Sequence, residues 1–262
     1  MNETISAIII TKNEEQRINA CLMSLDWVDE IVVVDSGSTD RTREICSQNS
    51  KVVFHELPWE GFGIQKNRAL ERASGDWVFS IDADEIVPPE LAAEIRGTIR
   101  NASCDGYTAK RKNFYRNQWI RHSGWWPDEI LRLFRRERGR FNDRLVHESV
   151  ELTGRPGQLA GCIEHYSFTS VGDFIRKADS YSSPGARVMF DRGKTTSPFK
   201  ALVRGTATFL KTYILKRGFL DGSAGILIAV SNAAGVFYRH MKCVELQQEN
   251  NGGQHQRHHN HL

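Results

Sequence analysis

The sequence predicts an α/β protein with a mostly parallel, doubly wound sheet and a helical C-terminal extension. Short apolar segments rich in β-branched residues alternate with helical patterns through residues 4–100. Strands and helices that alternate in this way form parallel sheets with helices on both faces. From residue 171 onward the strand pattern ends and long helical segments follow. A chain of 262 residues is long enough to bury a full core in this arrangement.

Four strands are predicted in the alternating part of the chain. They cover residues 4–11, 30–35, 52–55 and 77–82. Helical spacing of apolar residues predicts a helix after each of these strands. The first begins at residue 12, and the others cover residues 42–48, 64–73 and 90–100. Because apolar strands are buried, their carboxyl ends deliver the polar residues that follow to one edge of the sheet. Ligands bind at this edge in open α/β sheets.

Three carboxylates follow the fourth strand in the run Asp82-Ala83-Asp84-Glu85. Carboxylates at this spacing repel one another unless a cation lies among them, and Mg²⁺ or Mn²⁺ prefers oxygen ligands. A diphosphate would complete the coordination shell. The structural alternative is a turn, or the cap of the helix that begins after Pro88-Pro89.

Polar residues also end the first two strands. Asp35 has the chemistry to accept hydrogen bonds from a uracil imide or a ribose hydroxyl, and Thr11 and Glu14 lie at the neighbouring strand end. Alone, Asp35 is better explained as a turn cap and Glu14 as the start of a helix. Three adjacent strand ends that carry Thr, Asp and Asp-x-Asp favour a nucleotide site. A dinucleotide-binding fold is excluded, because no Gly-x-Gly-x-x-Gly follows the first strand.

Four motifs occur in order within residues 1–150. They are Thr11-Lys12-Asn13-Glu14, then Val34-Asp35-Ser36-Gly37-Ser38-Thr39-Asp40, then Gln65-Lys66-Asn67-Arg68-Ala69-Leu70 with Ala73-Ser74-Gly75-Asp76-Trp77, and Asp82-Ala83-Asp84-Glu85. This order resembles family 2 glycosyltransferases, which have the nucleotide-sugar-binding fold called GT-A. The resemblance implies a nucleotide bound by Thr11, Glu14 and Asp35. It also implies a metal-bridged diphosphate at Asp82 and Asp84, with Asp84 the more direct ligand of Mg²⁺ or Mn²⁺. Lys66 is a candidate phosphate contact, or alternatively a solvated lysine on a helix.

The region of residues 106–136 is basic and aromatic. Aromatic faces contact sugars, and arginine side chains bind phosphates or carboxylates through two hydrogen bonds. Single-stranded nucleic acid is the alternative ligand for such a composition. No RNA-binding signature accompanies it, however, and the net charge of the chain is only +3. We therefore expect no nucleic-acid partner.

An acidic pair, Asp128-Glu129, precedes a predicted strand of alternating apolar and arginine residues. Inverting transfer needs a carboxylate that takes the proton of the acceptor hydroxyl as its oxygen attacks the anomeric carbon. The family pattern makes Asp128 the candidate base and Glu129 the second; the structural alternative pairs Asp128 with a nearby arginine. Candidate acceptor-binding residues are Trp125, Trp126, Glu129, Arg132, Arg135 and His147. His147 and His165 are candidates for a further metal or diphosphate contact, although a lone histidine is more often structural.

A second set of motifs extends the resemblance to about Leu246. It comprises Gly124-Trp125-Trp126-Pro127-Asp128, Leu131-Arg132-Leu133-Phe134-Arg135-Arg136, Val146-His147-Glu148 and Gly218-Phe219-Leu220-Asp221-Gly222. These motifs resemble the family branch of bacterial lipopolysaccharide inner-core glucosyltransferases. The resemblance implies a UDP-sugar donor, specifically UDP-glucose, and an anionic lipid-linked oligosaccharide acceptor. Two other functions are weighed against it: a non-catalytic protein that binds nucleotide sugars or lipid headgroups on the same scaffold, and a nucleic-acid-binding module.

The predicted domains are a catalytic domain, a helical extension and a tail. The catalytic domain covers residues 1–170, with a nucleotide half over residues 1–100 and an acceptor half over residues 101–170. Helices are predicted at residues 174–190, 198–215 and 222–238 of the extension, which covers residues 171–246, with a break at Pro184-Gly185. Residues 247–262 are rich in Gln, Asn, Gly and His and are predicted to be disordered.

The predicted location is cytoplasmic. Five cysteines without a Cys-x-x-Cys pair favour a reducing compartment, and no secretory signal opens the chain. The basic, amphipathic helix of residues 198–215 suits the anionic cytoplasmic face of an inner membrane, and packing on the catalytic domain explains the pattern equally well. The apolar segment of residues 222–237 is expected to be too short to span a bilayer, which needs about 20 residues.

Overall fold

The computed structural model describes residues 3–142 and 149–259. The chain forms two compact units. Unit 1 comprises Met1–Asn113 and Pro127–Ser167, and unit 2 comprises Phe114–Trp126 and Phe168–Leu262.

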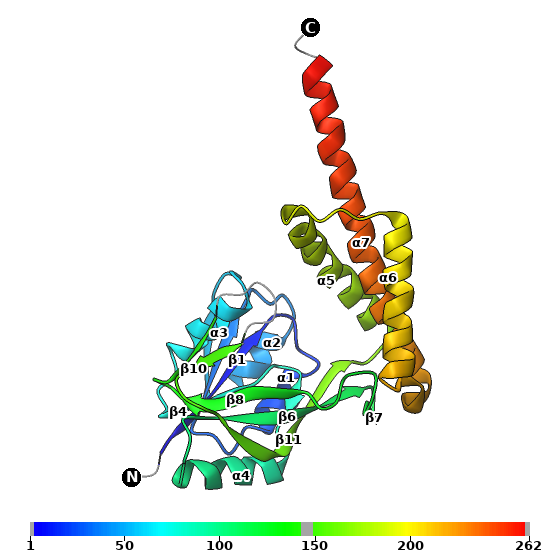
Figure 1. Ribbon diagram of the computed structural model, residues 1–262. Helices are drawn as coiled ribbons and strands as arrows, with labels where there is room; N and C mark the ends of the chain where they lie inside the picture. The colour runs from blue at the N-terminus through cyan, green and yellow to red at the C-terminus, as the bar shows by residue number, and fades with distance from the viewer. Residues whose placement is uncertain (1–2, 143–148, 260–262) are drawn as a thin grey trace. The chain divides into compact units, whose positions relative to one another are not determined.

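A mixed sheet forms the centre of unit 1 (Figure 1). Its strands are β1 (Ile5–Thr11), β2 (Glu30–Asp35), β3 (Val52–Glu56), β4 (Trp77–Ser80), β5 (Glu85–Ile86), β6 (Gly106–Tyr115), β8 (Glu129–Arg135) and β11 (Gly157–Phe168), in the order β3-β2-β1-β4-β8-β6-β11-β5. The first four neighbours are parallel, as predicted. Antiparallel pairs join β4 to β8, β8 to β6 and β11 to β5. Parallel neighbours need a crossover connection, usually a helix, and no described helix lies between β6 and β11, so the second half of the sheet is antiparallel.

Helices cover both faces of the sheet. They are α1 (Ile18–Met23), α2 (Thr42–Ser47), α3 (Phe62–Leu70) and α4 (Pro89–Arg100), and a separate two-stranded sheet joins β9 (Gly139–Phe141) to β10 (Val150–Leu152). Along β1, Ile5 and Ile9 belong to one apolar cluster with residues of α1 and α4, and Ile8 belongs to a second cluster with residues of α3. This alternation follows from the two-residue period of a strand. The sheet is therefore doubly wound.

The carboxyl ends of the parallel strands meet at one edge of the sheet. Thr11 at the end of β1 pairs in register with Asp35 at the end of β2. On the other side of β1, Ile8 pairs with Ser80, the last residue of β4. The run that begins at Asp82 therefore leaves the sheet beside the end of β1.

Unit 2 consists mainly of helices. They are α5 (Val171–Asp191), α6 (Pro198–Leu210), the π-helix η1 (Lys211–Leu215), the 3₁₀-helix η2 (Gly218–Asp221) and α7 (Gly222–His259). The predicted break at Pro184-Gly185 is not observed, because α5 continues through both residues. A proline inside a helix costs about 3 kcal/mol, and packing of α5 against α7 offsets this cost. The helix α7 continues to His259, beyond residue 247 where disorder was predicted; this stretch contains no proline to end it.

Residues 114–126 belong to unit 2 and not to the predicted acceptor half of the catalytic domain. Asp221, which is buried, explains this placement. Its carboxylate accepts hydrogen bonds from the backbone N–H groups of Arg121 and His122, both at 3.2 Å, and from Ser123 Oγ at 2.9 Å. The strand β7 (Gln118–Trp119) also pairs with the end of β6. These bonds tie the loop to the C-terminal helices.

One segment of unit 2 meets the length and composition expected of a membrane-crossing helix. It covers Gly218–Asn250, and its most apolar window has a mean hydropathy of 1.4. The sequence-based expectation that no segment is long enough is therefore wrong by this criterion, because the helix runs beyond the apolar core of residues 222–237. Only 28% of that window is buried.

Candidate active site

Acidic and basic side chains form a buried ion-pair network around Asp82. Its Oδ1 atom lies 3.1 Å from Lys66 Nζ, and its Oδ2 atom lies 2.8 Å from Arg132 Nη2. Arg132 Nη2 also donates to Glu85 Oε1 at 2.6 Å. Arg111 Nη1 contacts the same Glu85 atom at 3.1 Å and lies 3.7 Å from Asp82 Oδ2. Two carboxylates thus share three cations, and we call these five residues the Asp82 network.

The Asp82 network shifts the titration of its members in opposite directions. Burial alone would raise the pKa of Asp82, but the charges of Arg132 and Lys66, together with the Arg132 hydrogen bond and Arg111, hold it well below its usual value. Burial would lower the pKa of Arg132, and Asp82 and Glu85 outweigh that effect and raise it. Both partners therefore stay charged at neutral pH.

A chain of polar contacts connects Asp84 to Asp128. His165 Nε2 lies 3.3 Å from Asp84 Oδ2, and His165 Nδ1 lies 2.5 Å from Asn113 Oδ1. Asn113 Nδ2 in turn donates to Asp128 Oδ2 at 3.1 Å. Because the amide nitrogen of Asn113 faces a carboxylate, its oxygen is the acceptor and His165 Nδ1 carries the proton. We call this chain the Asn113 bridge.

Asp128 is held through one of its two carboxylate oxygens. Its Oδ2 atom accepts from Arg111 Nε at 2.9 Å and lies 2.8 Å from Arg111 Nη2, in addition to the bond from Asn113. Its Oδ1 atom accepts no hydrogen bond from the described part of the chain. The side chain is 30% exposed. The carboxylate is therefore oriented by two neighbours and keeps one oxygen available to a ligand.

Local strand pairing brings these residues together. The turn after β4 leads into β5, which pairs with β11 so that Glu85 lies opposite His165. The N–H of Tyr166 donates to the carbonyl of Asp84 at 3.0 Å and fixes that turn. On β6, Arg111 and Asn113 continue the face of the buried Ala109, because alternate residues of a strand share a face.

Sequence analysis named Glu85 only as part of the acidic run and Arg111 only as part of the basic region, and it assigned no role to Asn113. A signal for the last two was available, since both follow Ala109 at two-residue intervals. Polar residues on an apolar strand face need buried partners, and the acidic run supplies them. His165 was considered, and its position opposite Glu85 depends on a pairing that the sequence does not display.

The predicted nucleotide-binding residues lie at the adjoining strand ends. Asp35 is buried, and its carboxylate accepts hydrogen bonds from the backbone N–H of Gly37 at 2.9 Å and of Ser38 at 2.7 Å, and from the Ser38 hydroxyl. These contacts are those of the turn-capping alternative. The hydroxyl of Thr11 is buried and has no hydrogen-bond partner among the described residues. Glu14 forms an ion pair with Arg17 at 3.3 Å.

Comparison with known proteins identifies the family. A family model described as glycosyl transferase family 2 matches residues 6–154, which is more than half of the chain. The chain belongs to glycosyltransferase family 2. It is 31% identical over 256 residues to the lipopolysaccharide core biosynthesis glycosyltransferase LpsC of Rhizobium meliloti (strain 1021), covering 90% of this chain and 93% of that protein. It is 33% identical over 256 residues to an uncharacterized glycosyltransferase of Rickettsia typhi (strain ATCC VR-144 / Wilmington), covering 92% and 87%.

Among solved structures, this family 2 chain is similar to S. aureus TarS 1–349 in complex with UDP, with 17% identity and a TM-score of 0.49. The match covers 94% of this chain and 92% of that one. The family match, together with the mixed sheet and the helical extension, confirms the predicted α/β, GT-A fold class.

Family 2 membership raises the question of whether the acidic edge suits a divalent cation. Asn113 orients the His165 ring through Nδ1, so Nε2 faces Asp84 Oδ2 and one cation could take both atoms as ligands. Two ligands at right angles on an octahedral ion lie about 3 Å apart, close to the observed 3.3 Å. Over the described residues no cluster of three or more His, Cys, Asp or Glu side chains suits a metal. Asp84 and His165 therefore fit a metal that takes its other ligands from a diphosphate and water.

Two of the predicted acceptor-binding residues, Trp125 and Trp126, lie in unit 2. Trp125 packs against Phe168 and Phe174, with ring centroids 5.2 and 6.2 Å away, and Trp126 contacts Trp119 edge-on at 5.2 Å. These contacts make both side chains part of the apolar packing of unit 2.

The remaining acceptor candidates have different surroundings. Glu129 is exposed and accepts from Thr108 Oγ1 at 2.6 Å. Arg132 is buried in the Asp82 network and is not exposed to an acceptor. Arg135 pairs in register with Trp77 at the opposite end of β4 from Asp82, and its Nη1 atom lies 2.8 Å from Glu3 Oε1, so the structure separates it from the site. His147 lies outside the described residues.

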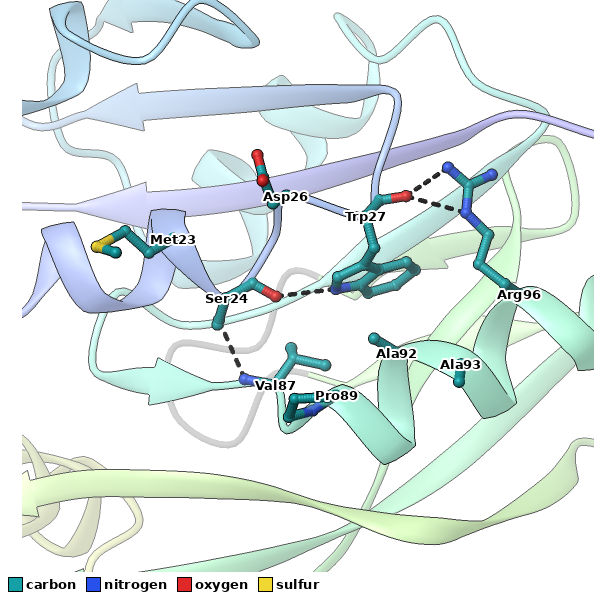
Figure 2. Close-up of a pocket in the computed structure, with 9 residues that line it drawn as sticks. All are labelled: Met23, Ser24, Asp26, Trp27, Val87, Pro89, Ala92, Ala93 and Arg96. Atoms are coloured by element: carbon teal, nitrogen blue, oxygen red, sulfur yellow. Dashed lines mark hydrogen bonds between the residues drawn. The ribbon is translucent and has the colours of Figure 1, made fainter.

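A separate pocket of about 440 Å³ lies elsewhere in unit 1 (Figure 2). Residues of α1, α4 and the segment between α1 and β2 line it, with Trp27 and Arg96 at one end. Arg96 Nε donates to the carbonyl of Trp27 at 2.9 Å, so its charge is engaged in holding this segment. None of the predicted site residues lines this pocket. The chemistry of the acidic edge therefore gives the better account of the active site.

Proposed function

We propose that this family 2 glycosyltransferase is an inverting hexosyltransferase that moves glucose from UDP-glucose to an inner-core lipopolysaccharide acceptor. The observation that carries the proposal is the Asn113 bridge, which connects two carboxylates in different surroundings at one edge of the sheet. Asp84 faces a histidine, as a metal ligand does, and Asp128 keeps an oxygen available, as a base does. The LpsC relative, named for lipopolysaccharide core biosynthesis, supports the acceptor class.

The donor would bind where the parallel strands end. The hydroxyl of Thr11, which has no partner within residues 3–142 and 149–259, offers one polar contact, since a buried hydroxyl without a partner is costly unless a ligand satisfies it. Asp35 would contact the nucleoside once the turn at Gly37-Ser38 adjusts, and Glu14 lies on the neighbouring loop. Lys66, buried beside Asp82, supplies positive charge at the diphosphate side. Bound Mg²⁺ or Mn²⁺ would neutralise the charge that develops on the leaving diphosphate.

The base assignment rests on how Asp128 is held. Arg111 and Asn113 fix its Oδ2 atom, which leaves Oδ1 to accept the proton of the acceptor hydroxyl. As the acceptor oxygen loses its proton, it attacks the anomeric carbon. The bond between that carbon and the UDP oxygen breaks on the opposite face. A single displacement of this kind inverts the configuration and needs no covalent intermediate. Glu129 is one residue away but bonds to Thr108, so it is the matched control for Asp128.

The acceptor and the location form the second part of the proposal. An inner-core acceptor is an anionic, lipid-linked oligosaccharide, so the enzyme would work at the cytoplasmic face of the inner membrane as a peripheral protein. The exposed apolar and basic residues of unit 2 support such a location.

The test separates donor binding from transfer. UDP and a panel of UDP-sugars, each with and without Mn²⁺ or Mg²⁺, are expected to raise the melting temperature, because a ligand that binds only the folded state stabilises it by mass action. UDP-glucose should give the largest shift among the sugars. Asp128→Asn should keep this shift and lose transfer by at least about a hundredfold, within the usual range for a general base. Glu129→Gln should keep both.

Three results would count against the proposal. Full transfer by Asp128→Asn removes the base assignment. A melting temperature that no UDP-sugar changes, with or without metal, removes the donor assignment. Retention of the anomeric configuration in the product, read by NMR, removes the single displacement.

A further inference from the structure

The helix α6 packs against α7 through its smallest side chains. Ala201 and Gly205 are the buried residues of α6. A Cβ atom on Gly205 would lie 3.3 Å from the carbonyl oxygen of Ala233 and 3.5 Å from the Cβ of Phe237, so the two helices approach closely at this point. Figure 1 shows α6 and α7 side by side in unit 2.

The large apolar side chains of α6 point away from this contact. Phe199 is 75% exposed and Leu202 is 60% exposed, and Val203 and Leu210 are also exposed. At about 100° per residue these four fall within an arc of about 100°, which does not include Ala201 or Gly205. The exposed apolar surface continues beyond α6 through Ile214, Leu215, Phe219 and Leu220.

This arrangement is the reverse of a helix that is stabilised in water. Such a helix buries its large apolar side chains, since burying each one contributes about 1.5–3 kcal/mol. Helices that contact lipid instead pack together through small residues and leave their large residues on the outside. The exposed apolar patch of unit 2 therefore needs a partner other than water.

The charge of this surface indicates which partner it suits. Between Asp191 and Asp221 the sequence contains no acidic residue and seven basic ones, Arg192, Lys194, Lys200, Arg204, Lys211, Lys216 and Arg217. Asp221 itself is buried. Lys200 and Arg204 are exposed and flank the apolar arc of α6 on one side. Apolar residues bordered by lysine and arginine are the pattern of a helix that lies on an anionic lipid surface.

We propose that the exposed residues of α6, η1 and η2 form a docking face for an anionic lipid bilayer. The apolar side chains would enter the boundary between headgroups and acyl chains, and the basic side chains would contact the phosphates. This inference deepens the proposed location at a membrane and rests on that part of the proposed function. It concerns unit 2 alone and does not depend on which sugar is transferred.

The experiment is flotation of the full chain with vesicles of phosphatidylcholine alone or with added phosphatidylglycerol. The chain is expected to float with the anionic vesicles, and more weakly as salt rises. Leu202→Glu and Leu215→Glu should each weaken binding by at least about tenfold, because an inserted leucine is lost. The double variant Arg204→Gln with Lys211→Gln should weaken it by about fivefold for each charge.

Matched controls come from α5 of the same unit. Ile175 is 66% exposed and apolar, so Ile175→Glu makes the same chemical change away from the proposed face. Arg176 and Arg187 are exposed basic residues that already pair with Asp173 and Asp191, so their replacement by Gln matches the charge variant. The controls should bind vesicles as the parent does, and all variants should keep the parent melting temperature.

Each contrary result has a definite meaning. Equal flotation with neutral vesicles, or of Leu202→Glu and the parent, would overturn the docking face. A self-association that Leu202→Glu abolishes, without vesicle binding by the parent, would assign the patch to a second copy of the chain. Binding that resists high salt and alkaline carbonate in every variant would indicate that α7 crosses the bilayer. Vesicle binding without transfer of any sugar would leave this inference intact and remove only the proposed function.

Discussion

One substitution at Asn113 tests the roles of Asp84 and Asp128, the two ends of the Asn113 bridge, separately. In Asn113→Asp, a carboxylate replaces the amide whose nitrogen donates to Asp128 Oδ2. The side chain still offers an oxygen to His165 Nδ1, so the orientation of that ring is kept. At Asp128, however, a donor becomes a like charge. We therefore expect the variant to keep metal-assisted UDP binding and to lose transfer.

The size of the loss follows from the contacts at Asp128. A hydrogen bond to a charged group contributes about 1.5–3 kcal/mol, which corresponds to about tenfold to a hundredfold in rate if it is needed in the transition state. Two like charges about 4 Å apart add up to about 4 kcal/mol of repulsion at an effective dielectric of 20, and solvent reduces this at a side chain that is 30% exposed. Repulsion favours protonation of the pair, so the activity of Asn113→Asp should fall off at a higher pH than that of the parent.

The assay compares kcat, KM for UDP-glucose and the pH dependence of kcat for three proteins. Asn113→Asp should lower kcat at pH 7 with little change in KM, and part of the activity should return at higher pH. Asn113→Ala removes both contacts and should weaken metal-assisted UDP binding as well. Asn117→Asp makes the same exchange at an exposed position and should behave as the parent. An unchanged pH profile and kcat in Asn113→Asp would refute the assignment of Asp128 as a base held by Asn113.

Three further predictions test packing, capping and thiol chemistry. Gly225→Ala should lower the free energy of unfolding by about 1–3 kcal/mol or more, because its Cβ would overlap the carbonyl oxygen of Gly218. Gly235→Ala is the control: its Cβ would have nothing closer than 4.0 Å, so the variant should be neutral or stabilise by up to about 1 kcal/mol. Chemical denaturation measures both. Burial would raise the pKa of Asp173, but hydrogen bonds from Thr169 and Ser170 outweigh this and lower it. Its contribution is therefore fully present above pH 4 or so and is lost progressively as the pH falls toward the lower folded value. Asp173→Asn should cost about 1 kcal/mol at pH 7 and clearly less at pH 2, and an equal cost at both would contradict the cap. Burial and the nearby charge of Asp35 raise the pKa of Cys46 to about 12. Iodoacetamide at pH 8 should therefore label the partly exposed Cys104 well before Cys46 in the folded chain, and equal labelling rates would contradict the burial of Cys46.

The parallel half of the sheet could be predicted from the sequence because its signals are local. Apolar β-branched runs mark β1, β2 and β4, and the helices between them enforce parallel neighbours. The antiparallel half depends on pairings between distant segments, such as β11 with β5, that no local pattern records. The continuation of α5 through Pro184 was likewise not predictable, because it depends on the packing of α5 against α7.

The candidate site shows the same division. The strand ends at Thr11, Asp35 and the acidic run were expected to adjoin, and the register of β1 with β2 and β4 agrees with this. The residue pattern alone does not distinguish Asp82 from Asp84, since both follow the same strand; only the family resemblance made Asp84 the more direct metal ligand. Their surroundings differ through side chains from α3, β6, β8 and β11, which give Asp82 three cations and Asp84 a histidine.

The balance of charge at this edge gives a physical reason for a divalent cation. Four carboxylates, those of Asp82, Asp84, Glu85 and Asp128, face the three cations Lys66, Arg111 and Arg132. A diphosphate would add negative charge to a site that already has an excess of it, and the cost of unpaired charge is high in a buried setting. Removing one carboxylate should therefore have opposite effects on two measurements. Asp84→Asn should bind UDP at least as well as the parent in EDTA, because one repulsive charge is gone, and it should lose the gain in affinity that Mn²⁺ gives the parent. Calorimetric titration of UDP with and without Mn²⁺ measures both, with the exposed Asp26→Asn as control. If Asp84→Asn weakens UDP binding equally in both conditions, Asp84 acts on the fold of the turn and not through a cation.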